Sequence, residues 1–185
     1  MNRRTFLQTS AVAGLGLAAR PVQPASVQDA YPPAEAITRG PGYHWFGYYD
    51  KWQVDPTGRY ALGCRVDFEG RSPTERDTLR IGTIDLHDNS RWTEIGTSRA
   101  WGWQQGCMLQ WIPGASGEVI WNDREGDAYV SRVVHVPSGK RRTLPRAIYT
   151  LSPDGTFAVG TEFNRIQNLR PGYGYAGIPD PYADV

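Results

Sequence analysis

The sequence predicts an all-β protein, an incomplete β-propeller of about two and a half four-stranded antiparallel blades behind a signal peptide. Three observations support this prediction. Short β-rich runs separated by turn residues fill most of the chain, a Pro-Gly hairpin pattern recurs along it, and paired arginines precede a short apolar run at the N-terminus.

The composition and the strand-like runs both favour a β protein. The 185 residues include 21 Gly, 14 Pro, 7 Trp and 10 Tyr, a composition that argues against a helical protein. Turn sequences such as "DPTG", "HDNS" and "SPDG" supply the residues that hairpins need. The predicted strands cover residues 59–68, 78–86, 91–96, 106–112, 118–123, 128–136, 140–145, 147–152 and 156–163.

The N-terminus has the pattern of a twin-arginine signal. Arg3 and Arg4 stand before a weakly apolar run, "AVAGLGLAA", that is too short to span a bilayer. We therefore expect a signal peptide and the start of a linker at 1–26, the rest of the linker at 27–42, and the propeller domain at 43–185. The expected location is periplasmic or secreted, with the twin-arginine export machinery as a partner and no stable membrane anchor.

Charge and cysteine content narrow the function classes. The formal net charge is +1, and it becomes −2 once the three arginines of residues 1–20 are removed. A near-neutral chain offers no basic face for nucleic acid. Cys64 and Cys107 are too few for a disulfide framework and lack metal-ligand spacing. In an exported protein they could pair, but each lies in a predicted strand, so two separately buried thiols are the favoured expectation and pairing is the alternative.

One hairpin sequence repeats. "DPTGRYALG" (55–63) and "SPDGTFAVG" (152–160) share Pro, Gly, an aromatic residue, Ala and Gly, and "WIPGASGEVIW" (111–121) is a looser copy. The prolines at 56, 113 and 153 are 57 and 40 residues apart. A period of roughly 40–50 residues with four short strands is typical of a propeller blade. A β-sandwich with similar hairpins is the alternative.

These repeats resemble the Pro-Asp-Gly repeats of propellers related to the Tol-translocation protein and to WD-repeat proteins. The resemblance covers residues 43 to about 165 and implies blades at about 43–98, 99–146 and 147–185, the last incomplete. Closed propellers have roughly 4–8 blades, so we expect the chain to be the N-terminal portion of a longer protein.

In a four-stranded blade joined by hairpins, the segment that leads into the first strand and the loop that follows the second strand lie on the same face of the propeller. Nearly all the unusual residues of the sequence fall in such segments, whereas the opposite turns are small and polar. The predicted functional face comprises residues 43–51, 69–77, 98–106, 122–127, 145–148 and 164–177.

Aromatic rings interleaved with planar polar groups on this face favour a carbohydrate site. The chain resembles exported propeller polysaccharide lyases, including oligogalacturonate and ulvan lyases, in which a His or Tyr base and a neutralising Arg carry out β-elimination. The resemblance implies His44, Tyr48 and Arg124 as catalytic residues. The expected substrate-binding residues are Tyr49, Lys51, Trp101, Trp103, Gln104, Gln105, Glu125 and Arg165.

The predicted function is therefore an exported propeller that binds an acidic oligo- or polysaccharide and, by this resemblance, cleaves it. The alternative is a non-catalytic module that binds a peptide or protein partner. Each of the aromatic residues is equally well explained as core packing between blades.

The stretch "YHWFGYYDKW" (43–52) is expected to divide its residues between core and site. Trp45, Phe46 and Trp52 should anchor the first blade. Gly47 should permit a bend that presents Tyr48 and Tyr49, with His44 and Lys51 at the rim.

No metal-ligand motif is present, and the cofactor is unknown. Asp123, Glu125 and Asp127 alternate as Ca²⁺ ligands could, but a charged hairpin loop explains them equally well. The motifs of serine hydrolases, zincins and P-loop enzymes are lacking.

Overall fold

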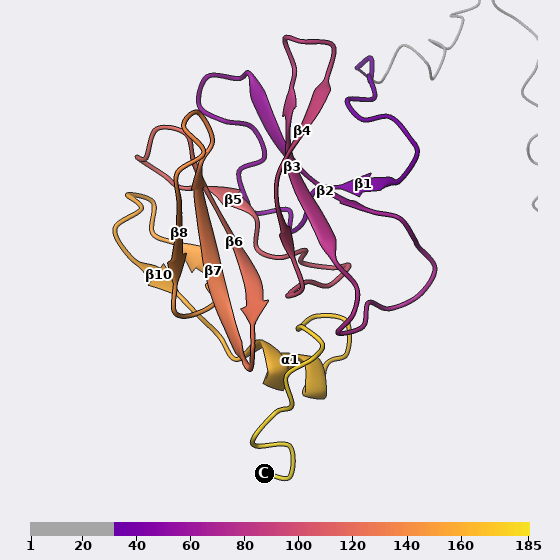
Figure 1. Ribbon diagram of the computed structural model, residues 1–185, viewed down its shortest axis with the longest axis vertical. Coiled ribbons are helices and arrows are strands. Elements are labelled where there is room, and N and C mark those ends of the chain that lie inside the picture. The colour runs from indigo at the N-terminus through magenta and orange to yellow at the C-terminus, as the bar shows by residue number, and fades with distance from the viewer. Residues whose placement is uncertain (1–31) are drawn as a thin grey trace, which may run out of the picture. The chain divides into compact units, whose positions relative to one another are not determined.

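The computed structural model describes residues 32–185, and these residues form an all-β fold, as the sequence predicts (Figure 1). Two four-stranded antiparallel sheets and one two-stranded hairpin make up the unit Ala36–Val185. The predicted signal peptide at 1–26 lies outside the described residues. The described strands form separate sheets and do not close into a ring.

The first sheet contains β1 (Tyr43–Trp45), β2 (Tyr60–Val66), β3 (Leu79–Asp85) and β4 (Arg91–Ser98), in that order. Apolar side chains alternate with polar ones at the start of β3, where Leu79 and Ile81 are buried and Arg80 is exposed. Gly82 lies beneath the indole ring of Trp92, where a Cβ would overlap the ring. The sheet therefore buries residues on both faces, and glycine makes room for the indole.

The aromatic stretch at 43–52 interrupts a strand, although we expected it to lead into one. β1 pairs with the C-terminal half of β2 through Trp45 and Cys64. Further along, Val54 forms a bridge with Ala61, near the start of the same β2. Residues 46–52 therefore form a loop between two segments that pair with one strand.

The second sheet contains β5 (Gln110–Trp111), β6 (Glu118–Glu125), β7 (Ala128–His135) and β8 (Arg141–Leu144), again in sequence order. β6 and β7 pair without interruption from Glu118↔His135 to Glu125↔Ala128. The turn that joins them uses Gly126 at φ +57°, a conformation that glycine adopts without strain.

The hairpin of β9 (Thr150–Leu151) and β10 (Ala158–Val159) is followed by α1 (Phe163–Leu169). The strand predicted at 156–163 is therefore wrong beyond Val159, and the helix was not predicted. A seven-residue helix is marginal by itself, so tertiary packing must hold it. Phe163 provides that packing, because its ring stacks on Tyr175 with centroids 4.1 Å apart.

The repeated sequences form equivalent turns. The amide of Asp55 donates to the carbonyl of Tyr60 at 2.9 Å, and the amide of Ser152 donates to the carbonyl of Phe157 at 2.9 Å. The pairs Val54↔Ala61 and Leu151↔Ala158 then continue the two hairpins in the same register.

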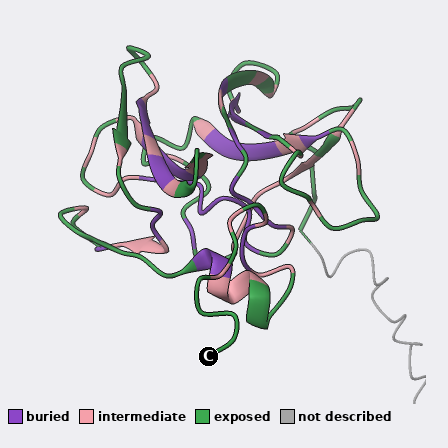
Figure 2. Cartoon of the chain, turned by 60° about the horizontal axis from the view of Figure 1, so that its bottom comes forward, coloured by how far each residue is buried: buried purple, intermediate pink, exposed green. Residues whose placement is uncertain are grey.

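The main core lies between the two sheets, and Figure 2 shows how burial concentrates along their strands. The Nε1 of Trp121 in β6 donates to the carbonyl of Thr97 in β4 at 3.0 Å, and an added Cβ on Gly96 would overlap the same indole ring. A second core cluster joins the second sheet to the hairpin and to the segment around Phe163 and Tyr175.

Candidate functional site

The structure brings the predicted segments 69–77 and 98–106 together. The indole Nε1 of Trp101 donates to the carbonyl of Asp77 at 3.1 Å, and that of Trp103 donates to the carbonyl of Arg71 at 2.7 Å. Arg71 and Asp77 in turn form a two-bond ion pair across the loop, with both nitrogen–oxygen distances at 2.7 Å. The loop before β3 is thereby held against the start of the second sheet.

Arg124 links three predicted segments. Its Nη2 donates to the carbonyl of Glu75 at 2.6 Å, and its guanidinium lies against Gly177. The guanidinium therefore holds 69–77, 122–127 and 164–177 next to one another.

The tryptophans predicted to bind substrate pack mainly against one another. The ring of Trp45 lies 5.7 Å from Trp101 and 4.9 Å from Trp103, measured between centroids. Trp101 is 2% exposed and belongs to the core between the sheets. Trp103 is half-buried at the edge of this cluster. Trp101 is thus a core residue and leaves no ring face for a sugar.

His44 lies on the opposite side of β1 from Trp45. Its ring makes an edge contact with Trp92 at 5.2 Å and lines a mostly apolar cavity of about 310 Å³ with Ile84 and Leu86. Both ring nitrogens are buried and lack a hydrogen-bond partner among the described residues. Burial, aided by the charge of Arg65, lowers the pKa of His44.

The residues after Gly47 differ from their predicted placement. Lys51 was expected at the rim, but it is buried, its Nζ 3.0 Å from the carboxylate of Asp50 and 5.3 Å from the ring centre of Tyr149. Trp52 was expected to be an anchor, but it is 74% exposed. Tyr49 is exposed, as predicted.

The three predicted catalytic residues have different contact partners. The ring of Tyr48 packs against that of Tyr49 at a tilt, with centroids 4.6 Å apart, whereas His44 contacts Trp92 and Arg124 contacts the loop before β3. No hydrogen bond or ring contact joins any two of the three among the described residues.

The two glutamines of the predicted site have different environments. Gln104 is exposed, whereas Gln105 is buried and its Oε1 has no partner within residues 32–185. The backbone of Gly47 packs on Gln105, since an added Cβ would lie 2.9 Å from the Gln105 carbonyl oxygen. This close approach explains the glycine.

Glu125 and Arg165 are both occupied by other parts of the chain. Arg132 pairs with Glu125 at 2.7 Å and with Asp123 at 3.1 Å, and Arg165 donates to the carbonyl of Tyr182 at 2.9 Å. Within the described part of the chain, no three His, Cys, Asp or Glu side chains gather as they would around a metal ion.

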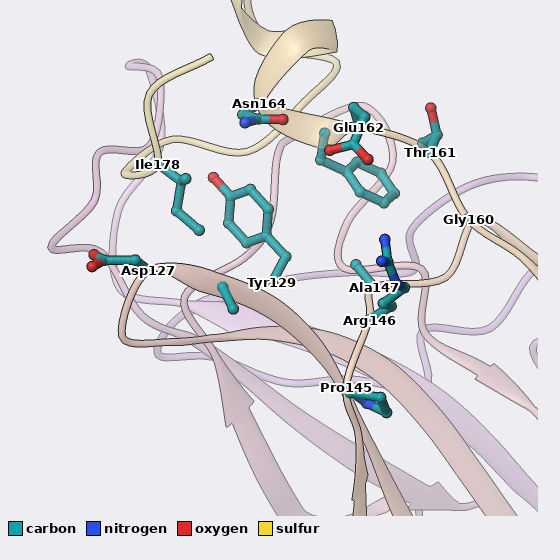
Figure 3. Close-up of a pocket in the computed structure, with 12 residues that line it drawn as sticks. Asp127, Tyr129, Pro145, Arg146, Ala147, Gly160, Thr161, Glu162, Asn164 and Ile178 are labelled. Atoms are coloured by element: carbon teal, nitrogen blue, oxygen red, sulfur yellow. The ribbon is translucent and has the colours of Figure 1, made fainter. Parts of the chain in front are cut away.

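A polar cavity of about 850 Å³ lies between the second sheet, the hairpin and α1 (Figure 3). Its walls come from three of the predicted segments or the residues beside them. The lining residues are Asp127, Ala128, Tyr129, Pro145, Arg146, Ala147, Gly160, Thr161, Glu162, Phe163, Asn164 and Ile178.

Tyr129 forms the fixed wall of this cavity. Its hydroxyl donates to the carbonyl of Tyr175 at 2.8 Å, and its ring meets that of Tyr175 edge-on at 5.4 Å. Burial raises the pKa of Tyr129 to about 12, so the hydroxyl stays protonated and cannot serve as a base near neutral pH.

The charged groups of the cavity are available to a ligand. Asp127, Arg146 and Glu162 make no side-chain hydrogen bond or ion pair among the described residues. Figure 3 shows Asp127 and Glu162 on opposite sides of Tyr129, with Arg146 below Glu162. Two carboxylates and one guanidinium thus surround a rigid aromatic wall.

Sequence reasoning found these segments but selected other residues within them. Asp127 and Arg146 lie in the predicted segments 122–127 and 145–148, and Asn164 begins 164–177. Tyr129 and Glu162 fall just outside. Choosing residues by the density of aromatic side chains missed them. What these residues share is that three separate segments of the chain lie side by side in the fold.

Comparison with known proteins finds no match to this chain among family models, curated proteins or solved structures. Among residues 32–185, no helix has the length and apolar character needed to cross a membrane.

Proposed function

We propose that this chain carries successive blades of an exported β-propeller, and that the cavity beside Tyr129 binds a hydroxyl-rich ligand, an oligosaccharide. The observation that carries the proposal is the cavity's lining: carboxylates and a guanidinium that make no side-chain hydrogen bond or ion pair within residues 32–185, around an aromatic wall. The meander order of both sheets and the equivalent turns at 55–60 and 152–157 support the propeller.

The cavity suits a sugar for chemical reasons. The carboxylates of Asp127 and Glu162 accept hydrogen bonds from hydroxyl groups, and each can accept more than one. Arg146 can form two parallel bonds with a carboxylate, which gives uronate-containing sugars an additional contact. The half-buried ring of Tyr129 offers an apolar surface to sugar C–H groups.

Binding is better supported than cleavage. β-Elimination needs a base near a neutralised carboxylate, and Arg146 would supply only the neutralisation. Tyr129 does not supply this base, because its hydroxyl is bound to a backbone carbonyl and its pKa is raised to about 12. The other bases in the lining are the carboxylates of Asp127 and Glu162, to which the proposal assigns hydrogen bonds with sugar hydroxyl groups.

Calorimetric titration of the full chain with neutral and uronate-containing oligosaccharides tests the proposal. We expect Glu162→Gln to weaken binding of both classes about tenfold and Arg146→Ala to weaken only the uronates. Glu69→Gln and Arg76→Ala change matching charges at exposed sites outside this cavity and should have no effect. If no glycan binds, or if the control pair acts equally, the cavity is not the site.

An exposed apolar patch favours a second function, binding of a peptide partner. Phe157 is 64% exposed and Val159 in β10 is 55% exposed, next to the cavity wall at Gly160. Selection of displayed peptides on the protein, repeated with Phe157→Ser, distinguishes the two functions. Peptides that need Phe157, together with an absence of glycan binding, would favour the second.

A further inference from the structure

The two cysteines of the chain meet between the sheets. Cys64 lies in β2, and Cys107 lies just before β5, so each belongs to a different sheet. Both are 0% exposed and belong to the core cluster that joins the sheets. Burial raises the pKa of the Cys107 thiol, and the nearby Cys64 thiol raises it further. The sequence favours two separately buried thiols, whereas the structure places both in one buried cluster.

Backbone packing explains this proximity. Gly106 adjoins Cys107 in the chain and packs on Gly47, so that an added Cβ on Gly106 would lie 3.1 Å from the Cα of Gly47 and 4.0 Å from the Sγ of Cys64. Trp45, two residues before Gly47, pairs with Cys64 in the first sheet. The packing of Gly106 on Gly47 and the pairing of Trp45 with Cys64 thus bring the backbone beside Cys107 close to Cys64.

We propose that Cys64 and Cys107 form a disulfide that covalently joins β2 of the first sheet to the start of the second sheet. The proposal is independent of the ligand in the cavity. It assigns a modification site to a pair of residues that are otherwise part of an apolar core.

The reaction is thiol–disulfide exchange with a disulfide donor, either a small-molecule disulfide or the disulfide of a thiol oxidase. One cysteine loses its proton and attacks a sulfur of the donor, which releases one donor thiol and leaves a mixed disulfide. The second cysteine loses its proton and attacks the first, which forms the Cys64–Cys107 bond and releases the second donor thiol. Two protons and two electrons pass to the donor, and two cysteine S–H bonds are replaced by one S–S bond.

Burial determines when the bond can form. With both thiols inside the core and the pKa of Cys107 raised by burial, the folded protein offers little thiolate to an oxidant in solution. The bond therefore forms before the two sheets have packed together. Once formed, it is equally protected from reductants.

The test uses the full chain, refolded in a glutathione buffer with glutathione disulfide as the oxidant and then alkylated under denaturing conditions. Intact mass should show a species lighter by two hydrogen atoms that takes no alkyl group until it is reduced, and two groups afterwards. Two alkylated cysteines without reduction, or disulfide-linked dimers, would overturn the proposal.

Single variants provide the control. Cys64→Ser and Cys107→Ser should each leave one alkylatable thiol or a glutathione adduct. Thermal melting gives a second measurement, because the oxidised wild-type chain should melt several degrees above the reduced chain, whereas Cys64→Ser should melt at one temperature in both buffers. Equal melting of oxidised and reduced wild type would show that no bond joins the sheets.

Discussion

The side-chain amide of Asn122 donates a hydrogen bond to the hydroxyl of Tyr175 at 2.9 Å, which ties β6 to a segment 53 residues further along the chain. The same amide nitrogen donates to the carbonyl of Ile148 at 2.7 Å. Its oxygen accepts from the amide of Ile148 at 2.8 Å and from the hydroxyl of Ser131 at 3.1 Å. One fully buried amide thus holds the C-terminal segment, and with it one wall of the cavity, on the second sheet.

Asn122→Ala should lower the free energy of unfolding by about 3 kcal/mol, because it leaves buried partners without hydrogen bonds. Urea denaturation followed by tryptophan fluorescence measures the change. Asn168→Ala is the matched control, since Asn168 is exposed and, among residues 32–185, its side chain donates a hydrogen bond only to Asp180. If the two variants lose equal stability, the network around Asn122 does not hold the fold together.

Gly96 lies at a close contact between the two sheets. An added Cβ there would overlap the indole of Trp121, so Gly96→Ala should lower the free energy of unfolding by about 1–3 kcal/mol. Gly40→Ala is the control, because an added Cβ at Gly40 meets nothing within 4 Å. A Gly96→Ala protein as stable as its control would mean that the sheets separate readily. Thermal melting followed by circular dichroism measures both.

Because burial lowers the pKa of His44, we expect the protein to lose stability in mild acid. Its pKa is lowered in the folded state by burial and by Arg65, so below its ordinary pKa of about 6.5 the unfolded chain binds more protons than the folded one. Stability should therefore fall as the pH drops below about 6.5, towards the lowered pKa of the folded state.

The measurement is the urea midpoint between about pH 7.5 and pH 5.5. His44→Phe keeps an aromatic ring against Trp92 but cannot be protonated, so its midpoint should change less over this range. Identical pH profiles for the two proteins would assign the acid sensitivity to other groups.

Much of the fold could be predicted from the sequence because strand alternation and turn residues are local signals. β2, β3, β6 and β7 fall within two residues of their predicted bounds, and the Pro-Gly hairpins form where they were expected. The helix α1 was missed because its stability comes from the stacking of Phe163 on Tyr175, a contact that no local pattern reveals.

The site was less predictable than the fold. Chain order alone places loops at one end of a meander, so the segments were found. Which side chain points outward depends on the pleat and on loops such as 46–52. His44 and Trp45 are neighbours in sequence but lie on opposite sides of β1, and Lys51 turns inward while Trp52 turns outward.

Trp52 is exposed and Trp101 is buried, so the two residues should differ in their contribution to stability. This reverses the role first expected for Trp52. Trp101→Ala should lower the free energy of unfolding by about 3–5 kcal/mol, because it empties a large volume within the packed core. Trp52→Ala should change it by less than about 0.5 kcal/mol, because most of that ring is already in water. Urea denaturation of both variants, followed by circular dichroism, makes the comparison directly. If Trp52→Ala is the more damaging of the two, the loop at 46–52 packs in solution against a surface that residues 32–185 do not provide.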